Sequence, residues 1–270
     1  MTHTKTTDPS QHESTAAKAP SLSIRKLGIV SRDYTHTYPN GHRDFSHSFL
    51  AVLALLDDLG CDAVLFSPWS IVPREGYDPV TALRLRNVKA ILYEHFPQGS
   101  DGVQRRPPFV VACQTETGWL KYERSQVFGT LTEKFDMSAF VREELPRRIL
   151  GNACVLICGE TNGVKYSPKD KKVHDIYGLV GALPGDVKVI LNPVHDRMTR
   201  FEMVRKREFL SRGGRWVVAV WNKGKRNKNG KTMDGKGVPW TVFHDGKPVT
   251  VERVENDLNV EIGIVDLRTA

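Results

Sequence analysis

The residues best suited to covalent chemistry lie at the end of an apolar run in the middle of the chain. Ala153–Ile157 has the composition of a buried strand, and Cys158-Gly159-Glu160 follows it at once. In α/β proteins, ligands and nucleophiles gather where strands end, and a glycine after the cysteine permits a sharp turn. The pattern predicts a nucleophilic thiol at a strand end, and a strand-end cysteine without any chemistry is the open alternative.

Strands and helices alternate through the segments that must position this cysteine. Leu27–Val30 predicts a buried strand, Phe45–Leu59 an amphipathic helix that ends at Gly60, and Ala63–Phe66 a second strand. Further expected strands are Val88–Tyr93, Phe109–Cys113, Trp119–Tyr122, Ala153–Cys158, Val187–Leu191, Trp216–Trp221, Trp240–His244, Val249–Val254 and Val260–Val265. Further expected helices are Val80–Leu85, Leu145–Leu150, Lys172–Leu183 and Arg200–Arg212. We therefore expect one α/β domain over residues 23–270, after a disordered tail over residues 1–22.

The composition excludes several classes of protein. No run of 18 or more apolar residues exists, and the polar start of the chain lacks the apolar region of a secretory signal. We therefore expect a cytoplasmic protein without a membrane span. Its four cysteines would be reduced, with Cys61, Cys113 and Cys154 as small buried side chains. Neither the cysteines nor the histidines have zinc-ligand spacing, so no metal or cofactor is implied.

The net charge of +8 permits anionic partners. Six Lys or Arg residues against one Asp lie between Lys223 and Lys236. This stretch has no interleaved aromatic residues, which nucleic-acid platforms usually have. Three interpretations stay open: a solvated loop, a site that steers an anionic ligand or substrate, and a contact to a nucleic-acid backbone.

The order of several motifs resembles that of the nitrilase, or carbon–nitrogen hydrolase, family. The motifs are Cys158-Gly159-Glu160 after a strand, Val189-Ile190-Leu191-Asn192-Pro193, the helix Arg200–Arg212, and Val217–Asn222 with its closing Asn. The opening strand, helix and strand also match, so the resemblance spans nearly the whole chain after the tail. It implies a four-layer αββα sandwich, a small-molecule substrate and a homo-oligomer such as a dimer.

The family reaction uses Cys as nucleophile, Glu as general base and Lys to stabilise the tetrahedral intermediate. Cys158 matches the nucleophile, but the position of the Glu falls on Trp69, which cannot accept a proton. The position of the Lys falls on Arg124, in Tyr122-Glu123-Arg124. Arg stays cationic but does not transfer protons. Glu133 matches a second acidic residue that the family often carries.

Two functional hypotheses follow from this resemblance. In the first, Cys158 attacks an amide, nitrile or ureido compound, Arg124 stabilises the intermediate, and Glu133, perhaps helped by Glu160, moves protons. Trp69, Asn192 and Asn222 would line the substrate site. Glu94 at a strand end, Glu75, and the adjacent pair His195-Asp196 rank behind these as site residues. In the second hypothesis the chain is a non-catalytic relative that binds an anionic ligand, a protein or nucleic acid.

Overall fold

The computed structural model describes residues 21–33, 45–71, 78–95, 107–128, 136–195, 201–224, 229 and 237–268. The described strands form two large sheets and one small hairpin. None of the described helices is both long and apolar enough to cross a bilayer.

The first sheet contains seven of the described strands. In order across the sheet they are β14 (Glu252–Val254), β15 (Val260–Asp266), β1 (Lys26–Arg32), β2 (Ala63–Phe66), β3 (Ala90–Glu94), β4 (Phe109–Thr115) and β5 (Gly118–Arg124). β1, β2 and β3 are parallel, whereas the outer pairs are antiparallel. The carboxyl ends of β1, β2 and β3 therefore lie at one edge of the sheet.

The second sheet contains six of the described strands around a parallel centre. They are, in order, β13 (Lys247–Pro248), β12 (Trp240–His244), β11 (Trp216–Trp221), β10 (Val189–Val194), β7 (Ala153–Val155) and β6 (Ile149–Leu150). β7, β10 and β11 run parallel to one another. Their carboxyl ends lead to Cys158, His195 and Asn222, respectively.

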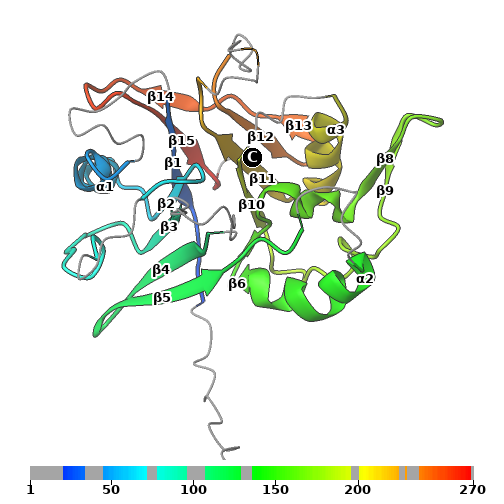
Figure 1. Cartoon of the computed structure of the whole chain (residues 1–270), viewed down its shortest axis with the longest axis horizontal. Helices are drawn as coiled ribbons and strands as arrows, with labels where there is room; N and C mark the ends of the chain where they lie inside the picture. The colour runs from blue at the N-terminus through cyan, green and yellow to red at the C-terminus, as the bar shows by residue number, and fades with distance from the viewer. Residues whose placement is uncertain are drawn as a thin grey trace, which may run out of the picture.

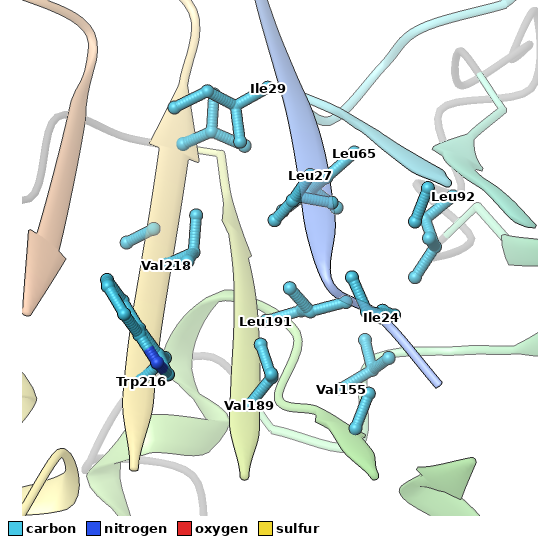
Figure 2. Close-up of a cluster of buried hydrophobic side chains, with 14 of the residues drawn as sticks. Ile24, Leu27, Ile29, Leu65, Leu92, Val155, Val189, Leu191, Trp216 and Val218 are labelled. Carbon is cyan, nitrogen blue, oxygen red and sulfur yellow. The ribbon is translucent and has the colours of Figure 1, made fainter. Parts of the chain in front are cut away.

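The two sheets pack face to face over a continuous apolar core. Alternate residues of each strand point into it, as the two-residue repeat of a strand requires. Figure 2 shows Leu27, Ile29, Leu65 and Leu92 of the first sheet opposite Val155, Val189, Leu191, Trp216 and Val218 of the second. This shared core fixes the position of one sheet relative to the other.

Helices cover the outer face of each sheet, so the molecule has four layers (Figure 1). On the first sheet, α1 (Phe49–Asp58) buries Phe49, Val52 and Leu56 against Val64 and Ile91. On the second sheet lie α2 (Met137–Ala139), the π-helical turn Phe140–Glu144, the 3₁₀ helix Leu145–Arg148 and α3 (Phe201–Leu210). A small hairpin, β8 (Lys165–Ser167) and β9 (Lys172–His174), contacts α3. The order helix, sheet, sheet, helix is the nitrilase-like αββα sandwich that the resemblance implied.

The structure corrects two of the expected helices. Residues 172–183 begin as β9 and continue as turns, because Gly178 has a positive φ of 72°. The Asp175 carboxylate accepts the N–H groups of Leu179 (2.7 Å) and Val180 (2.8 Å), which would otherwise be donors within a helix. Residues 80–85 also form turns, near an Asp78 carboxylate that accepts the Val80 N–H. The remaining long helices and the central strands lie within a few residues of their expected positions.

The segment before β1 closes one end of the sandwich. Leu22, at the end of the expected tail, is buried, and its carbonyl accepts the Asn152 N–H at 2.9 Å. The Asn152 side chain in turn accepts the Ile24 N–H at 3.0 Å. Gly151 makes this contact possible, because its φ is 59° and a Cβ there would lie 2.0 Å from the Leu22 carbonyl oxygen.

We predict that Gly151→Ala lowers the free energy of unfolding by about 3 kcal/mol or more, because backbone strain adds to a clash with Leu22. Gly60→Ala is the matched control, since Gly60 also has a positive φ (73°) but nothing lies within 4 Å of its Cβ position. That variant should lose only about 1 kcal/mol. Urea denaturation measures both, and equal losses would contradict the packing of Leu22 on Gly151.

Candidate active site

Cys158 lies on a strained turn between a strand and a helix. β7 ends at Val155, and Cys158 opens the 3₁₀ helix Cys158–Gly163. The strain falls on Cys158 itself, with φ at 46°, and not on Gly159, which was expected to form the turn. A nucleophile held at a left-handed strand-to-helix turn is the arrangement of the nucleophile elbow in α/β-hydrolases. Cys158 is 9% exposed, so its sulfur lies in a largely closed site.

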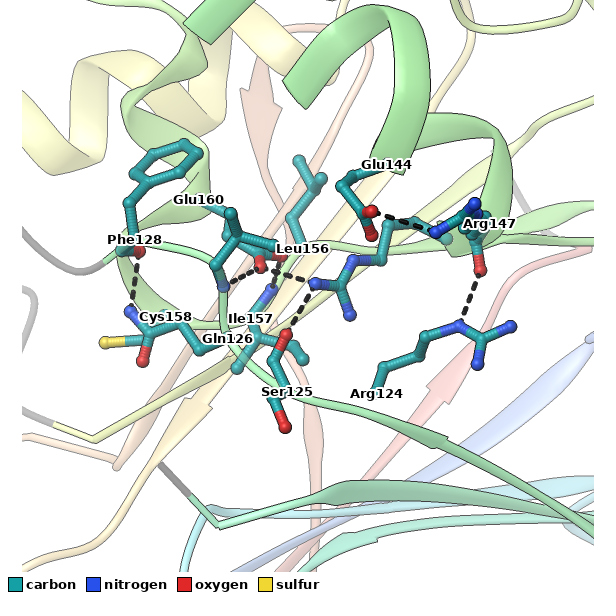
Figure 3. A network of polar contacts seen from close by, with 12 residues as sticks. Arg124, Ser125, Gln126, Phe128, Glu144, Arg147, Leu156, Ile157, Cys158 and Glu160 are labelled. Carbon is teal, nitrogen blue, oxygen red and sulfur yellow. Dashed lines mark hydrogen bonds and ion pairs between the residues drawn. The ribbon is translucent and has the colours of Figure 1, made fainter. Parts of the chain in front are cut away.

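Glu160 anchors this turn from within the protein. One carboxylate oxygen accepts the Arg148 guanidinium (2.7 Å) and the Val127 N–H (2.9 Å), and the other accepts the Ile157 N–H (2.9 Å) (Figure 3). Burial raises the pKa of Glu160 to about 7, although Arg148 and the two N–H groups favour the carboxylate. The structure therefore places Glu160 as a brace that joins the turn to Arg148 and to the chain at Val127.

Asn192 and Asn222 brace the site from the ends of β10 and β11. The Asn192 side-chain nitrogen donates to the carbonyls of Leu156 (2.6 Å) and Cys158 (3.3 Å). The Asn222 side-chain nitrogen donates to the Pro68 carbonyl at 2.7 Å, and its oxygen accepts the Ser67 hydroxyl. Both amides thus hold backbone around the site, one at the cysteine turn and one at the loop after β2.

His195 connects Cys158 to a buried carboxylate. It follows β10 directly, and its Nε2 lies 2.7 Å from Oε2 of Glu94, the last residue of β3. The Cys158 side chain is a second hydrogen-bond partner of the ring, and Nδ1 is the nitrogen that remains for it. Burial disfavours a charge on the ring, but the hydrogen bonds and charges of Cys158 and Glu94 outweigh it and raise the pKa of His195 to about 10.

Trp69 lies beside this chain of hydrogen bonds. Its backbone N–H donates to Glu94 Oε2 at 3.1 Å, and its ring centroid lies 5.2 Å from that of His195. Trp69 has a positive φ of 58°, a second strained residue at the site. The position that holds a carboxylate in the family therefore still serves one, because the Trp69 backbone contacts Glu94.

The structure places Arg124 away from the sulfur. Its guanidinium donates to the carbonyls of Glu123 (2.8 Å) and Arg147 (3.4 Å), and Figure 3 shows it turned toward Arg147, on the other side of the network from Cys158. The charge of Cys158 instead acts on Arg207, a buried residue of α3. A different cation thus lies near the nucleophile.

Three of the expected candidates lie outside the described residues: Glu133, Glu75 and Asp196. Most of the basic stretch from Lys223 to Lys236 lies outside them as well. Lys223 is described, and its Nζ lies 2.6 Å from Glu261. In the part of the chain that the structure describes, no three His, Cys, Asp or Glu side chains gather as a metal site requires.

Glu94 and His195 were ranked behind other candidates in the sequence, although both carry the signal that singled out Cys158. Each stands at the carboxyl end of a buried apolar strand. What the sequence could not provide is the pairing, because 101 residues separate them and they belong to different sheets. A thiol, an imidazole and a carboxylate in hydrogen-bonded order can carry out nucleophilic acyl transfer.

Two solved structures are similar to this chain. The first, "Crystal structure of carbon-nitrogen hydrolase from Helicobacter pylori G27", is 11% identical with a TM-score of 0.42, over 91% of this chain and 90% of that one. The second, a glutamine-dependent NAD(+) synthetase from Cytophaga hutchinsonii, is 13% identical with a TM-score of 0.48, over 92% of this chain and 43% of that one. No protein-family model and no curated protein matches the sequence. The first structure bears the name of the family that the motifs resemble.

We predict that Arg148→Met lowers the free energy of unfolding by about 3 kcal/mol at pH 8, because it leaves the buried Glu160 without its cation. The loss should be smaller at pH 5. Without Arg148 the folded pKa of Glu160 lies further above its unfolded value, so stability is retained at low pH and lost as pH rises.

Arg147→Met is the matched control, because the neighbouring Arg147 forms an exposed pair with Glu144. It should cost less than about 1 kcal/mol, with no such dependence on pH. Denaturant unfolding at the two pH values measures both variants. A loss for Arg148→Met that is equal at pH 5 and pH 8 would contradict the coupling to Glu160.

Proposed function

We propose that this chain is a thiol-dependent hydrolase of a carbon–nitrogen bond in a small amide, nitrile or ureido compound. Cys158 is the nucleophile, His195 transfers protons, and Glu94 orients the imidazole. The observation that carries the proposal is the hydrogen-bonded series Cys158, His195, Glu94, with the sulfur on a strained turn. It supplies a base and an acid that the family positions Trp69 and Arg124 cannot supply.

The acylation step on an amide uses the resting charges of the site. With a pKa near 10, His195 is protonated at neutral pH, and a cationic imidazole favours the thiolate form of a neighbouring cysteine. The sulfur attacks the carbonyl carbon, and the carbonyl oxygen takes the negative charge. When the C–N bond breaks, His195 donates its proton to the departing nitrogen, so that ammonia or an amine leaves and a thioester remains on Cys158.

Deacylation reverses the role of His195. The now neutral imidazole accepts a proton from a water molecule, whose oxygen attacks the thioester carbon. The C–S bond then breaks, which releases the carboxylic acid and restores the thiolate beside the imidazolium. Glu94 keeps the ring in one orientation through both steps, because its carboxylate holds Nε2 at 2.7 Å while Nδ1 faces the sulfur.

The predicted substrate contacts divide into different roles. We assign Trp69 to the wall of the substrate site, because its ring lies against His195. Asn192, Asn222 and Glu160 hold the two loops that carry Cys158 and Trp69. We assign these three to positioning, where a change would displace the nucleophile or the wall and would not remove a reacting group.

We predict that p-nitrophenyl acetate, an activated acyl donor, gives a stoichiometric burst of p-nitrophenolate and an acetyl adduct on Cys158. Stopped-flow absorbance measures the burst, and peptide mass spectrometry locates the adduct. His195→Asn should slow the burst by about a hundredfold, because the site loses its proton donor and acceptor. Glu94→Gln should slow it less, since the ring is kept but loses a charged partner.

The other cysteines serve as internal controls. Burial raises the pKa of Cys61 to about 11 and that of Cys113 to about 12. Neither should be acetylated in the folded protein. An adduct confined to lysines, or a burst that His195→Asn leaves intact, would overturn the proposal and favour the non-catalytic hypothesis. A burst supports a screen of amides, nitriles and ureido compounds by release of ammonia.

The pH dependence of alkylation tests the same charges without a substrate. At pH 6 the protonated His195 should hold Cys158 in its reactive form, so iodoacetamide should label it rapidly. His195→Asn should slow labelling at pH 6 by at least about tenfold and at pH 9 by far less, because an ordinary thiol ionises near pH 8.5. The same slow rate in both proteins at pH 6 would exclude a thiolate–imidazolium pair.

A further inference from the structure

Arg207 is a buried cation that the reaction as described above does not use. It belongs to α3 and is fully buried, with 0% exposure. Its Nη1 donates to the Thr241 hydroxyl at 2.9 Å, and its guanidinium carbon lies 5.7 Å from the Trp221 ring centroid. Both printed neighbours are uncharged, so they hold the guanidinium in place without neutralising it.

The packing of α3 brings Arg207 to the end of the sandwich where the nucleophile lies. Met203, one helical turn earlier, shares a face of α3 with Arg207. Met203 also packs into the same apolar cluster as Cys158. Trp221, which lies beneath the guanidinium, pairs in register with Val194, the residue directly before His195. The guanidinium is thus fixed on the same strand ends that carry the proposed triad.

The charges of Arg207 and Cys158 act on each other. Burial lowers the pKa of Arg207 to about 10, and the negative charge of Cys158 opposes that decrease. Arg207 therefore stays cationic at neutral pH. Coulombic interactions between groups so enclosed are weakened by solvent far less than those on the surface.

Given the proposed hydrolase function, we propose that Arg207 supplies the positive charge that stabilises negative charge at the nucleophile during the reaction. It would take the electrostatic role that the resemblance assigned to Arg124. Arg124 donates to two backbone carbonyls on the far side of the Glu160 network, whereas Arg207 interacts with the sulfur. A rigid buried cation needs no rearrangement as charge develops, which is the condition for effective electrostatic stabilisation.

A pair of alkylating reagents tests this charge without a substrate. Iodoacetate and iodoacetamide have similar size but differ in charge, so a cation beside Cys158 accelerates the anionic reagent selectively. The ratio of their rates at Cys158 should fall about tenfold in Arg207→Met. It should be retained in Arg207→Lys, and also in Arg124→Met, which changes the cation that the family resemblance had favoured.

Arg212→Met is the matched control, because Arg212 also stacks on an aromatic ring, at 5.5 Å from Phe209, but is exposed. It should leave the ratio unchanged. Arg207→Met should also slow the p-nitrophenyl acetate burst by about a hundredfold, as the loss of one group that stabilises an oxyanion does. Should Arg207→Met fail to fold, Arg207→Lys and Arg207→Gln give the same comparison of charge, since each can still donate to Thr241.

The outcomes separate this inference from the proposed function. An unchanged rate ratio and burst in Arg207→Met, with a burst that still depends on Cys158 and His195, would overturn the role of Arg207 alone. A wild-type protein without any burst would overturn the hydrolase proposal. In that case, a rate ratio that still falls in Arg207→Met would support the Arg207–Cys158 charge pair in the resting protein. An unchanged ratio would remove that pair as well.

Discussion

The hydrogen bond between Glu94 and His195 joins the two sheets at the edge where their parallel strands end. Glu94 closes β3 in the first sheet and His195 follows β10 in the second. The bond forms only because the apolar core sets the two sheets in one register, so packing distant from the site determines its geometry. A buried carboxylate is costly unless it is paired, and the His195 imidazolium and the Trp69 N–H provide that pairing.

The braces around this bond explain why a strained turn can persist at Cys158. A left-handed non-glycine residue costs about 1–3 kcal/mol and survives where its surroundings over-determine it. Here Glu160 holds the residue before the turn, and Asn192 holds the carbonyl of Cys158 itself. Asn222 acts in the same way on the loop that ends in the strained Trp69. Stability at these contacts is thus converted into a fixed position for the sulfur.

The sequence predicted the sandwich well because continuous apolar strands and one amphipathic helix are local patterns. It failed for residues 172–183, where a glycine in the left-handed region and the side chain of Asp175 override an apparent helical repeat. For the site, the strand-end rule led to Cys158, but family positions then favoured Arg124 over residues with the same strand-end signal. Glu94 and His195 acquire their meaning only from a contact across 101 residues, which no local pattern encodes.

The most direct test is an NMR titration of His195, with the imidazole labelled and its resonance assigned through His195→Asn. If Cys158, His195 and Glu94 form one charged hydrogen-bonded unit, the ring should remain protonated through neutral pH and titrate near pH 10. The midpoint should fall in Glu94→Gln and in Cys158→Ala, because each variant removes one of the charges that hold the proton. A wild-type midpoint near 6.5, unaffected by either variant, would contradict the account.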